Sequence, residues 1–248
     1  MTIEATGSFI PFQAVFNFRE VGGLPAADGS RVRTKALYRS DTLSRLCDAD
    51  RTAFAQLGVD SVIDLRRHEE VSAGGRAPDW AAPAYHHRHL DHPYWRTEDY
   101  DAERGVARFL ADRYAELIKH GAADIAGVIS LVAQADSGTP VVHCVAGKDR
   151  TGTVIALILR LLGVDQETVA HEYALTELAD PAYVAWANVH VPGFAEKPPV
   201  PYYVSTPPEA MLLTLRELDA AYGSVEALLT AAGLSADDIA RLRAKLLE

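Results

Sequence analysis

Cysteine is scarce in this sequence: only two occur among its 248 residues. So few cysteines exclude a disulfide-stapled scaffold and favour a reducing compartment. The sequence also lacks an uninterrupted apolar run of about 18 residues, so we expect no transmembrane helix. Residues 1–12 hold no basic cluster and only a short apolar run, which argues against a standard signal peptide. We therefore expect a cytoplasmic protein, or one that is exported without a removable signal.

Positive charge is also in short supply. Lys and Arg number 24 against 34 Asp and Glu, which gives a formal net charge of −10 at pH 7. Because proteins that bind nucleic acid are typically basic, we expect no nucleic-acid partner. We expect a single domain over residues 1–248, with a core at about 10–180 and a helical part at about 181–248.

Strand-like and helix-like segments alternate over the first two thirds of the chain. Strands are predicted at 14–18, 36–38, 61–65, 85–90 and 140–143, and helices at 48–57, 102–120, 122–135 and 151–162, then 165–178, 207–222, 225–232 and 236–247. Gly121 is expected to end the helix at 102–120. This order predicts an α/β fold, with a largely parallel central sheet flanked by helices and a helical C-terminal extension. The proline-rich stretch 191–208 has no regular period, and we favour a connector over a loop beside a binding site.

The segment from His143 to Gly152 reads HCVAGKDRTG and lies between a strand-like run and an apolar helix-like run. A helix N-terminus has unpaired N–H groups and a partial positive charge, so it attracts anions. Gly147 allows the backbone of residues 145–148 to curl so that its N–H groups point inward. Lys148 and Arg150 add positive charge, and Arg150 can bind two phosphate oxygens at once. Val145, Ala146, Gly147 and Lys148 are therefore predicted to bind a phosphate group.

Cys144 stands at the mouth of this loop. Such surroundings lower a thiol pKa from about 8.5 to roughly 3.5–7.5, so we expect a thiolate at neutral pH. A thiolate beside bound phosphate predicts nucleophilic attack on phosphorus and a cysteinyl-phosphate intermediate that water hydrolyses. Arg150 and the loop amides would stabilise the phosphoryl oxygens. Thr151 is expected to donate its hydroxyl to the sulfur, and His143 to orient the backbone of Cys144.

A purely structural interpretation of the same residues stays open but is disfavoured. A single buried cysteine is usually an inert small apolar residue, and His143 could be a core histidine. The charged sequence Lys148-Asp149-Arg150, however, is too polar to continue a buried strand. A nucleotide-binding loop is excluded, because Asp149 stands where that motif requires Ser or Thr.

Several other stretches accompany this loop in a fixed order. They are Asn17-Phe18-Arg19-Glu20 with Gly22-Gly23, Leu37-Tyr38-Arg39-Ser40, Leu43-Ser44-Arg45-Leu46, Ile63-Asp64-Leu65-Arg66 and Tyr222-Gly223-Ser224. Together the motifs resemble the cysteine-dependent protein tyrosine phosphatase superfamily, and the Gly-Lys-Asp-Arg-Thr-Gly form is similar to its bacterial tyrosine and phosphoinositide phosphatases. The resemblance spans nearly the whole chain and is weakest between residues 73 and 138. It implies a hydrolase of phosphotyrosine proteins, with dual-specificity or phosphoinositide activity as a further expectation.

Hydrolysis also needs an acid that protonates the leaving oxygen. The resemblance implies an aspartate from a loop after an earlier strand, and Asp91 follows the predicted strand at 85–90. Asp91 is the first choice and Asp149, inside the phosphate loop, is the second. This sequence lacks the tryptophan-proline-aspartate pattern of the eukaryotic enzymes, so the position of the acid is open.

Neither a metal nor a cofactor is expected. His86, His87, His89 and His92 invite a metal interpretation, but cysteine-based phosphoryl transfer needs no metal and a histidine-rich edge is common at surfaces. We expect Cys47 to be a buried residue at a helix start.

Three other functions remain open. A rhodanese-like sulfurtransferase and an arsenate reductase also use a thiolate in an anion-binding loop, although the Arg150-Thr151-Gly152 ending speaks against both. A non-catalytic phosphate-binding module would typically have lost Cys144 or Arg150, and both are present. Lys148 beside Arg150 suits a substrate that carries more charge than phosphotyrosine.

Overall fold

The central feature of the computed structural model, which describes residues 9–134, 138–196 and 200–248, is one five-stranded sheet. Its strands are β1 (Arg19–Glu20), β2 (Tyr38–Ser40), β3 (Val59–Asp64), β4 (Ala84–His87) and β5 (Thr139–His143), in the order β1-β2-β5-β3-β4. β1 pairs antiparallel with β2, and all other pairs are parallel. The prediction of a largely parallel sheet is therefore confirmed.

The carboxyl ends of the three inner strands meet at one edge. His143, the last residue of β5, is in register with Ser40 of β2 on one side and with Asp64 of β3 on the other. In a sheet of parallel strands this edge is where binding sites form, because the loops that follow the strands converge there. The loop after His143 thus starts from the middle of the sheet.

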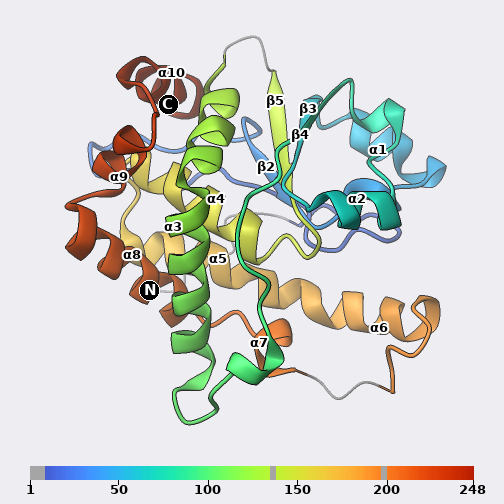
Figure 1. The fold of residues 1–248 in the computed structure, drawn as a ribbon. Helices are drawn as coiled ribbons and strands as arrows, with labels where there is room; N and C mark the ends of the chain where they lie inside the picture. The colour runs from blue at the N-terminus through green and yellow to red at the C-terminus, as the bar shows by residue number, and fades with distance from the viewer. Residues whose placement is uncertain (1–8, 135–137, 197–199) are drawn as a thin grey trace.

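Helices cover both faces of the sheet (Figure 1). They are α1 (Arg51–Ala55), α2 (His68–Gly74), α3 (Gly105–Ala133), α4 (Asp149–Leu161), α5 (Gln166–Ala174), α6 (Asp180–His190), α7 (Pro201–Val204), α8 (Pro208–Tyr222), α9 (Val225–Ala231) and α10 (Ala236–Leu246). Alternation along the strands divides the core: Val142 and Ile63 pack in one apolar cluster with α3 and α4, whereas Val141 and Val62 pack in another with Phe54 of α1.

The larger apolar cluster also includes the C-terminal helices. Val142 of the sheet shares it with Leu215 of α8, Leu229 of α9 and Leu242 of α10. This shared core supports a single domain, which stays a proposal. No helix within the described ranges is both long and apolar enough to cross a membrane. Residues 1–8, which belong to the segment that we expect not to be a signal peptide, lie outside the described residues.

Two predicted boundaries are wrong for identifiable reasons. Residues 14–18 form no strand, because the Asp41 carboxylate accepts the backbone N–H groups of Phe16 and Asn17 and fixes them in a turn. The helices predicted at 102–120 and 122–135 are one helix, α3, that continues through Gly121. A Cβ at Gly121 would lie 3.2 Å from the Asp91 carbonyl oxygen, so this glycine makes room for a neighbouring loop and ends nothing. Residue 135 lies outside the described residues.

Other elements differ in extent. The helix predicted at 48–57 is a 3-10 turn (Asp48–Asp50) followed by α1, and the one at 165–178 ends as an α-helix at Ala174.

Within the stretch 191–208, the helix α7 buries Tyr202 completely, and the Tyr202 carbonyl accepts a hydrogen bond from Lys148. The interpretation of this stretch as a mere connector is therefore wrong at α7, whereas residues 197–199 lie outside the described residues.

Candidate active site

The loop between β5 and α4 places Cys144 directly after the sheet and Asp149 at the first turn of the helix. Cys144 is only 2% exposed, whereas the next residue, Val145, is 41% exposed. Gly147 has a φ of +67°, and a Cβ there would lie 2.4 Å from the carbonyl oxygen of Ser40. Only glycine satisfies both conditions, so the loop can lie tightly against the end of β2.

The backbone of this loop offers a row of hydrogen-bond donors. Among the described residues, no protein acceptor receives the N–H groups of Val145, Ala146, Gly147 or Lys148. Successive N–H groups that receive no protein acceptor and lie next to a helix N-terminus can bind an anion. Phosphate binding by residues 145–148 stays a prediction that this loop geometry is compatible with.

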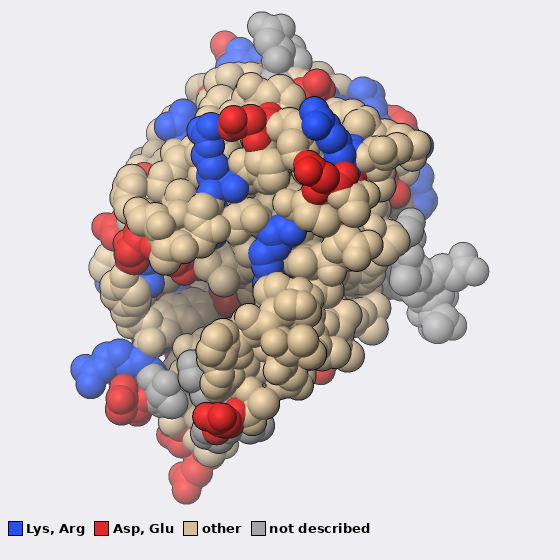
Figure 2. Space-filling view, turned by 90° about the vertical axis from the view of Figure 1, so that its right-hand side faces the viewer, with Lys and Arg blue, Asp and Glu red and all other residues tan. Residues whose placement is uncertain are grey.

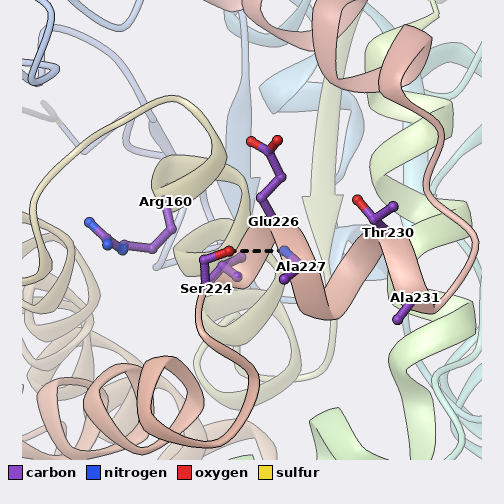
Figure 3. Close-up of a pocket in the computed structure, with 7 residues that line it drawn as sticks. Arg160, Ser224, Glu226, Ala227, Thr230 and Ala231 are labelled. Carbon is purple, nitrogen blue, oxygen red and sulfur yellow. Dashed lines mark hydrogen bonds between the residues drawn. The ribbon is translucent and has the colours of Figure 1, made fainter.

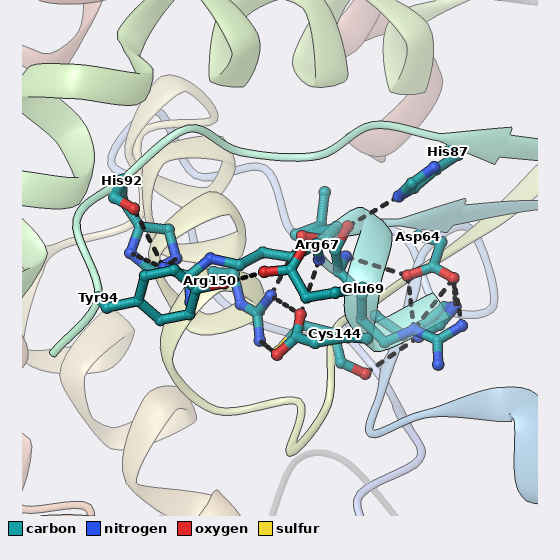
Figure 4. Close-up of polar contacts among 12 residues, drawn as sticks. Asp64, Arg67, Glu69, His87, His92, Tyr94, Cys144 and Arg150 are labelled. Atoms are coloured by element: carbon teal, nitrogen blue, oxygen red, sulfur yellow. Dashed lines mark hydrogen bonds and ion pairs between the residues drawn. The ribbon is translucent and has the colours of Figure 1, made fainter. Parts of the chain in front are cut away.

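Arg150 is held by a carboxylate that sequence reasoning missed. Its Nη1 and Nη2 lie 2.5 and 3.0 Å from the two carboxylate oxygens of Glu70 in α2 (Figure 4). Burial alone would lower the pKa of Arg150, but the charges of Cys144 and Glu70 outweigh it and raise that pKa above its ordinary value. Glu70 also accepts the N–H of Arg67 and so completes the first turn of α2. The guanidinium beside the cysteine is thus fixed in one plane.

His143 connects the cysteine to a buried ion pair. Its Nδ1 lies 3.1 Å from the carbonyl oxygen of Cys144, and its Nε2 lies 3.6 Å from Asp64. Burial lowers the pKa of His143, in spite of the opposing charge of Asp64, so the imidazole is neutral at neutral pH. Asp64 is bound in turn by Arg66, and its pKa lies below the ordinary value because His143 and Arg66 outweigh its burial. This arrangement holds the end of β5 in place.

Thr151 lies fully buried in the first turn of α4. Its hydroxyl has no hydrogen-bond partner within the described part of the chain, so the expected bond to the Cys144 sulfur is not formed in this structure. Leaving a buried hydroxyl unpaired costs about 1–3 kcal/mol. The Thr151 hydroxyl is therefore available to a further acceptor.

Lys148 is turned away from solvent beneath α7. It is 2% exposed, donates to the carbonyl of Tyr202 and lies 3.8 Å from the Asp149 carboxylate. Asp149 also accepts a 2.8 Å hydrogen bond from the hydroxyl of Tyr114 in α3. A second carboxylate, Asp180 at the start of α6, has its pKa raised to about 6 because burial outweighs the attraction of Lys148.

Asp91 is bonded to α3 and not to the loop between β5 and α4. Its side chain is exposed, and its backbone N–H donates to Asp124 in the middle of α3. No contact among the described residues joins it to Cys144 or Arg150. The structure therefore brings Asp149, but not Asp91, into the hydrogen-bonded surroundings of the loop.

Comparison with known proteins decides the family. The sequence pattern of the tyrosine phosphatase family matches residues 10–248, nearly the whole chain. The chain belongs to this family. It is 33% identical over 155 residues to a tyrosine-protein phosphatase of Nostoc commune, a match that covers 61% of this chain and 52% of that protein. It is 28% identical over 273 residues to the triple specificity protein phosphatase PtpB of Mycobacterium tuberculosis, covering 94% of this chain and 96% of that protein. At the level of the family, the predicted enzyme class is confirmed.

Two residues of this phosphatase family member could have been suspected from sequence. Glu70 stands three positions after Arg67, which is the capping-box spacing at a helix start. Asp180 precedes Pro181, a pair typical of a helix N-terminus. Neither signal indicates proximity to Cys144, which depends on the fold.

Neither the histidine-rich segment nor the second cysteine, Cys47, belongs to a metal site within the described residues. The rings of His87 and His89 lie 4.6 and 5.6 Å from that of His68, yet no three His, Cys, Asp or Glu side chains within the described ranges are placed to hold a metal ion. Cys47 is exposed and its sulfur lies 3.4 Å from Asp50, so the expectation that it is buried is wrong.

A surface pocket of about 670 Å³ lies elsewhere. It is lined by Arg160, near the C-terminal end of α4, and by residues of α9 such as Glu226 and Thr230 (Figure 3). Since the phosphate loop adjoins the opposite end of α4, this pocket is not part of the candidate active site. On the face shown in Figure 2, acidic and basic side chains are interspersed and form no continuous basic surface.

Proposed function

We propose that the protein hydrolyses phosphate monoesters, above all phosphotyrosine in proteins, through a cysteinyl-phosphate intermediate on Cys144. The observation that carries this proposal is the placement of Cys144 beside four loop N–H groups that receive no acceptor in the described part of the chain, with the guanidinium of Arg150 fixed by Glu70. Membership of the tyrosine phosphatase family supports it. So does the printed name of the Nostoc commune relative, a tyrosine-protein phosphatase.

In the first step, the Cys144 thiolate attacks phosphorus, an S–P bond forms and the ester P–O bond breaks. The leaving oxygen takes a proton from a nearby carboxylic acid. In the second step, water attacks phosphorus and gives a proton to the carboxylate, the S–P bond breaks, and inorganic phosphate and the thiolate are released. Arg150 and the loop amides stabilise the phosphoryl oxygens in both steps, and Thr151 donates to the departing sulfur.

Asp149 is the acid that position supports best. It immediately precedes Arg150, and its carboxylate contacts Lys148 and Tyr114. Asp91, the first choice on sequence grounds, is exposed and tied to α3 through its backbone. Asp91 would need its loop to move before it could protonate a leaving group, so it is the second candidate.

We rank phosphotyrosine ahead of phosphoinositides as substrate because the ammonium group of Lys148 is already bound by other groups of the protein. The ammonium group that would bind an extra phosphate is buried and engaged by the Tyr202 carbonyl and Asp149. A phosphoinositide would have to displace these partners. The name triple specificity, which belongs to the Mycobacterium tuberculosis relative, makes a broader substrate range the second proposal.

Release of inorganic phosphate from para-nitrophenyl phosphate tests the proposed reaction. We expect turnover by the wild-type protein and none by Cys144→Ser, since a serine hydroxyl is not ionised at neutral pH. Undiminished turnover by Cys144→Ser would exclude Cys144 as nucleophile. Sulfur transfer from thiosulfate to cyanide, or reduction of arsenate, without phosphate release would instead establish one of the two alternative enzymes. Phosphate binding with none of these activities would indicate a non-catalytic module.

A further inference from the structure

Three consecutive carbonyl groups of the phosphate loop are held from outside it. The Val145 carbonyl accepts the backbone N–H of Thr42 at 3.0 Å. The Ala146 carbonyl accepts the side-chain amide of Asn17 at 2.9 Å, and the Gly147 carbonyl accepts Nη2 of Arg39 at 2.7 Å. Each carbonyl therefore has its own donor, and all three donors come from the segments that surround β1 and β2.

These contacts fix the direction of the loop N–H groups. A trans peptide is planar, and its C=O and N–H point in opposite directions. The peptides of the described residues are trans, so a donor on the carbonyl of Val145, Ala146 or Gly147 turns the N–H of the following residue the other way. The N–H groups of residues 146–148 belong to the loop N–H groups that have no protein acceptor among the described residues. Their common orientation is thus set by Thr42, Asn17 and Arg39.

One buried carboxylate, Glu172, anchors two of these donors, Arg39 directly and Asn17 through Arg19. Glu172 of α5 binds Nη1 of Arg39 at 2.5 Å and Nε of Arg19 at 2.9 Å. Arg19 also donates to the Oδ1 of Asn17, so the amide of Asn17 can turn only its Nδ2 toward the Ala146 carbonyl. Arg19 and Arg39 are fully buried, and Glu172 is 5% exposed.

Glu172 and Arg19 remain charged at neutral pH although both side chains are buried. The attraction of Arg19 and Arg39 outweighs the burial of Glu172 and lowers its pKa, so the carboxylate is ionised. Burial and the neighbouring Arg39 lower the pKa of Arg19 to about 10, which still leaves it charged at neutral pH. The buried Asp41 carboxylate also acts on Arg19, so the buried charges beside the loop are of both signs.

We propose that Arg39 and Asn17 are positioning residues that preorganise the loop amides for the phosphoryl group, with Glu172 as their common anchor. The proposal rests on the phosphatase function proposed above. Hydrogen-bond donors that already point at the phosphoryl oxygens stabilise the transition state without a free-energy cost of reorientation. A backbone N–H misaligned by as little as about 1 Å can cost on the order of 100-fold in rate.

Two substitutions of nearly unchanged size test this role. Asn17→Asp keeps the oxygen that accepts from Arg19 but cannot donate to the Ala146 carbonyl. Arg39→Lys keeps a buried cation for Glu172 but offers a single nitrogen, which cannot reach both Glu172 and Gly147 as the two guanidinium nitrogens do. Asp238→Asn is the control, because Asp238 is a buried carboxylate that accepts hydrogen bonds from Ser130 and Ser235 and, within the described residues, contacts neither the loop nor Glu172.

The measurements are kcat, KM, the inhibition constant of orthovanadate and the melting temperature, with rates normalised to the Cys144 that iodoacetate alkylates. We expect Asn17→Asp and Arg39→Lys to lower kcat and to weaken orthovanadate binding, each by about 10- to 100-fold. Asp238→Asn should lower the melting temperature but leave the orthovanadate constant unchanged.

The outcomes separate a positioning role from a structural one. If Asn17→Asp and Arg39→Lys reduce only the melting temperature and leave kcat and the orthovanadate constant unchanged, the proposal is wrong. It is equally wrong if Asp238→Asn weakens orthovanadate binding as much as Arg39→Lys. These results leave the proposed function intact, because that function fails only if the wild-type protein releases no phosphate or if Cys144→Ser retains full turnover.

Discussion

Glu70 binds the guanidinium of Arg150 through two hydrogen bonds, of 2.5 and 3.0 Å, although the two residues are 80 positions apart in the sequence. Since the guanidinium has five N–H donors, this pairing fixes its plane and leaves further N–H groups for a phosphoryl group. The partner of Arg150 is therefore supplied by the first turn of α2, the helix that follows β3.

Replacement of Glu70 should weaken catalysis without removing it. In Glu70→Gln the amide nitrogen cannot accept from Arg150, so one of the two hydrogen bonds is lost and the guanidinium gains freedom. We expect kcat for para-nitrophenyl phosphate to fall about 10-fold. Glu69→Gln is the control, because Glu69 binds Tyr94 instead of Arg150. Equal rates for wild type and Glu70→Gln would show that the orientation of Arg150 does not depend on this pair.

The assignment of the acid predicts a dependence on the leaving group. Asp149→Asn should slow aryl phosphates with poor leaving groups far more than those with good ones, since only the former need a proton as the ester bond breaks. Asp91→Asn should slow both classes little. A series of substituted phenyl phosphates measures the slope of log kcat/KM against leaving-group pKa. A steeper slope for Asp91→Asn and an unchanged one for Asp149→Asn would move the role to Asp91.

The burial of Lys148 predicts a difference between substrates. Lys148→Met removes the ammonium group that binds the Tyr202 carbonyl, so α7 should become less firmly attached and exchange its amide hydrogens faster. Turnover of a phosphotyrosine peptide should change little, whereas turnover of a phosphoinositide in mixed micelles should fall more. Equal losses on both substrates would indicate that Lys148 acts on the transferred phosphoryl group itself.

The raised pKa of Asp180, about 6, predicts how stability depends on pH. Between the ordinary value of 3.8 and about 6, the folded protein retains a proton that the unfolded chain has released. The contribution of this carboxyl to stability therefore falls as pH rises through that range. Because asparagine cannot ionise, Asp180→Asn should raise the melting temperature near pH 7 and have a smaller effect near pH 4. A variant that is stabilised equally at both values would contradict the assigned shift.

The chemistry of the loop could be predicted from sequence because it is local. Cys144, Gly147 and Arg150 lie within a few residues of one another, and the strand before them and the helix after them follow from apolar patterning. The partners could not be predicted in this way. Glu70 reaches Arg150, and Glu172 reaches Arg39, only because β2, β3 and β5 are neighbours in the sheet.

The errors have a similar origin. Gly121 was expected to end a helix because glycine favours helix ends, but it serves the close approach of the Asp91 backbone to α3. Tyr202 was placed in a connector because the surrounding prolines disrupt any period, yet burial against the core and the bond from Lys148 hold it beside the active site. Both features arise from contacts between distant segments.

The central claim is that the phosphoryl group passes through Cys144, and trapping the intermediate tests it most directly. Wild-type protein mixed with para-nitrophenyl phosphate is quenched in acid within milliseconds, digested and examined by mass spectrometry. We predict a mass increase of one phosphoryl group on the peptide that contains Cys144, together with a burst of nitrophenol of at most one equivalent per enzyme. Steady phosphate release without any phosphorylated Cys144 peptide, or a phosphoryl group on another residue, would contradict the account.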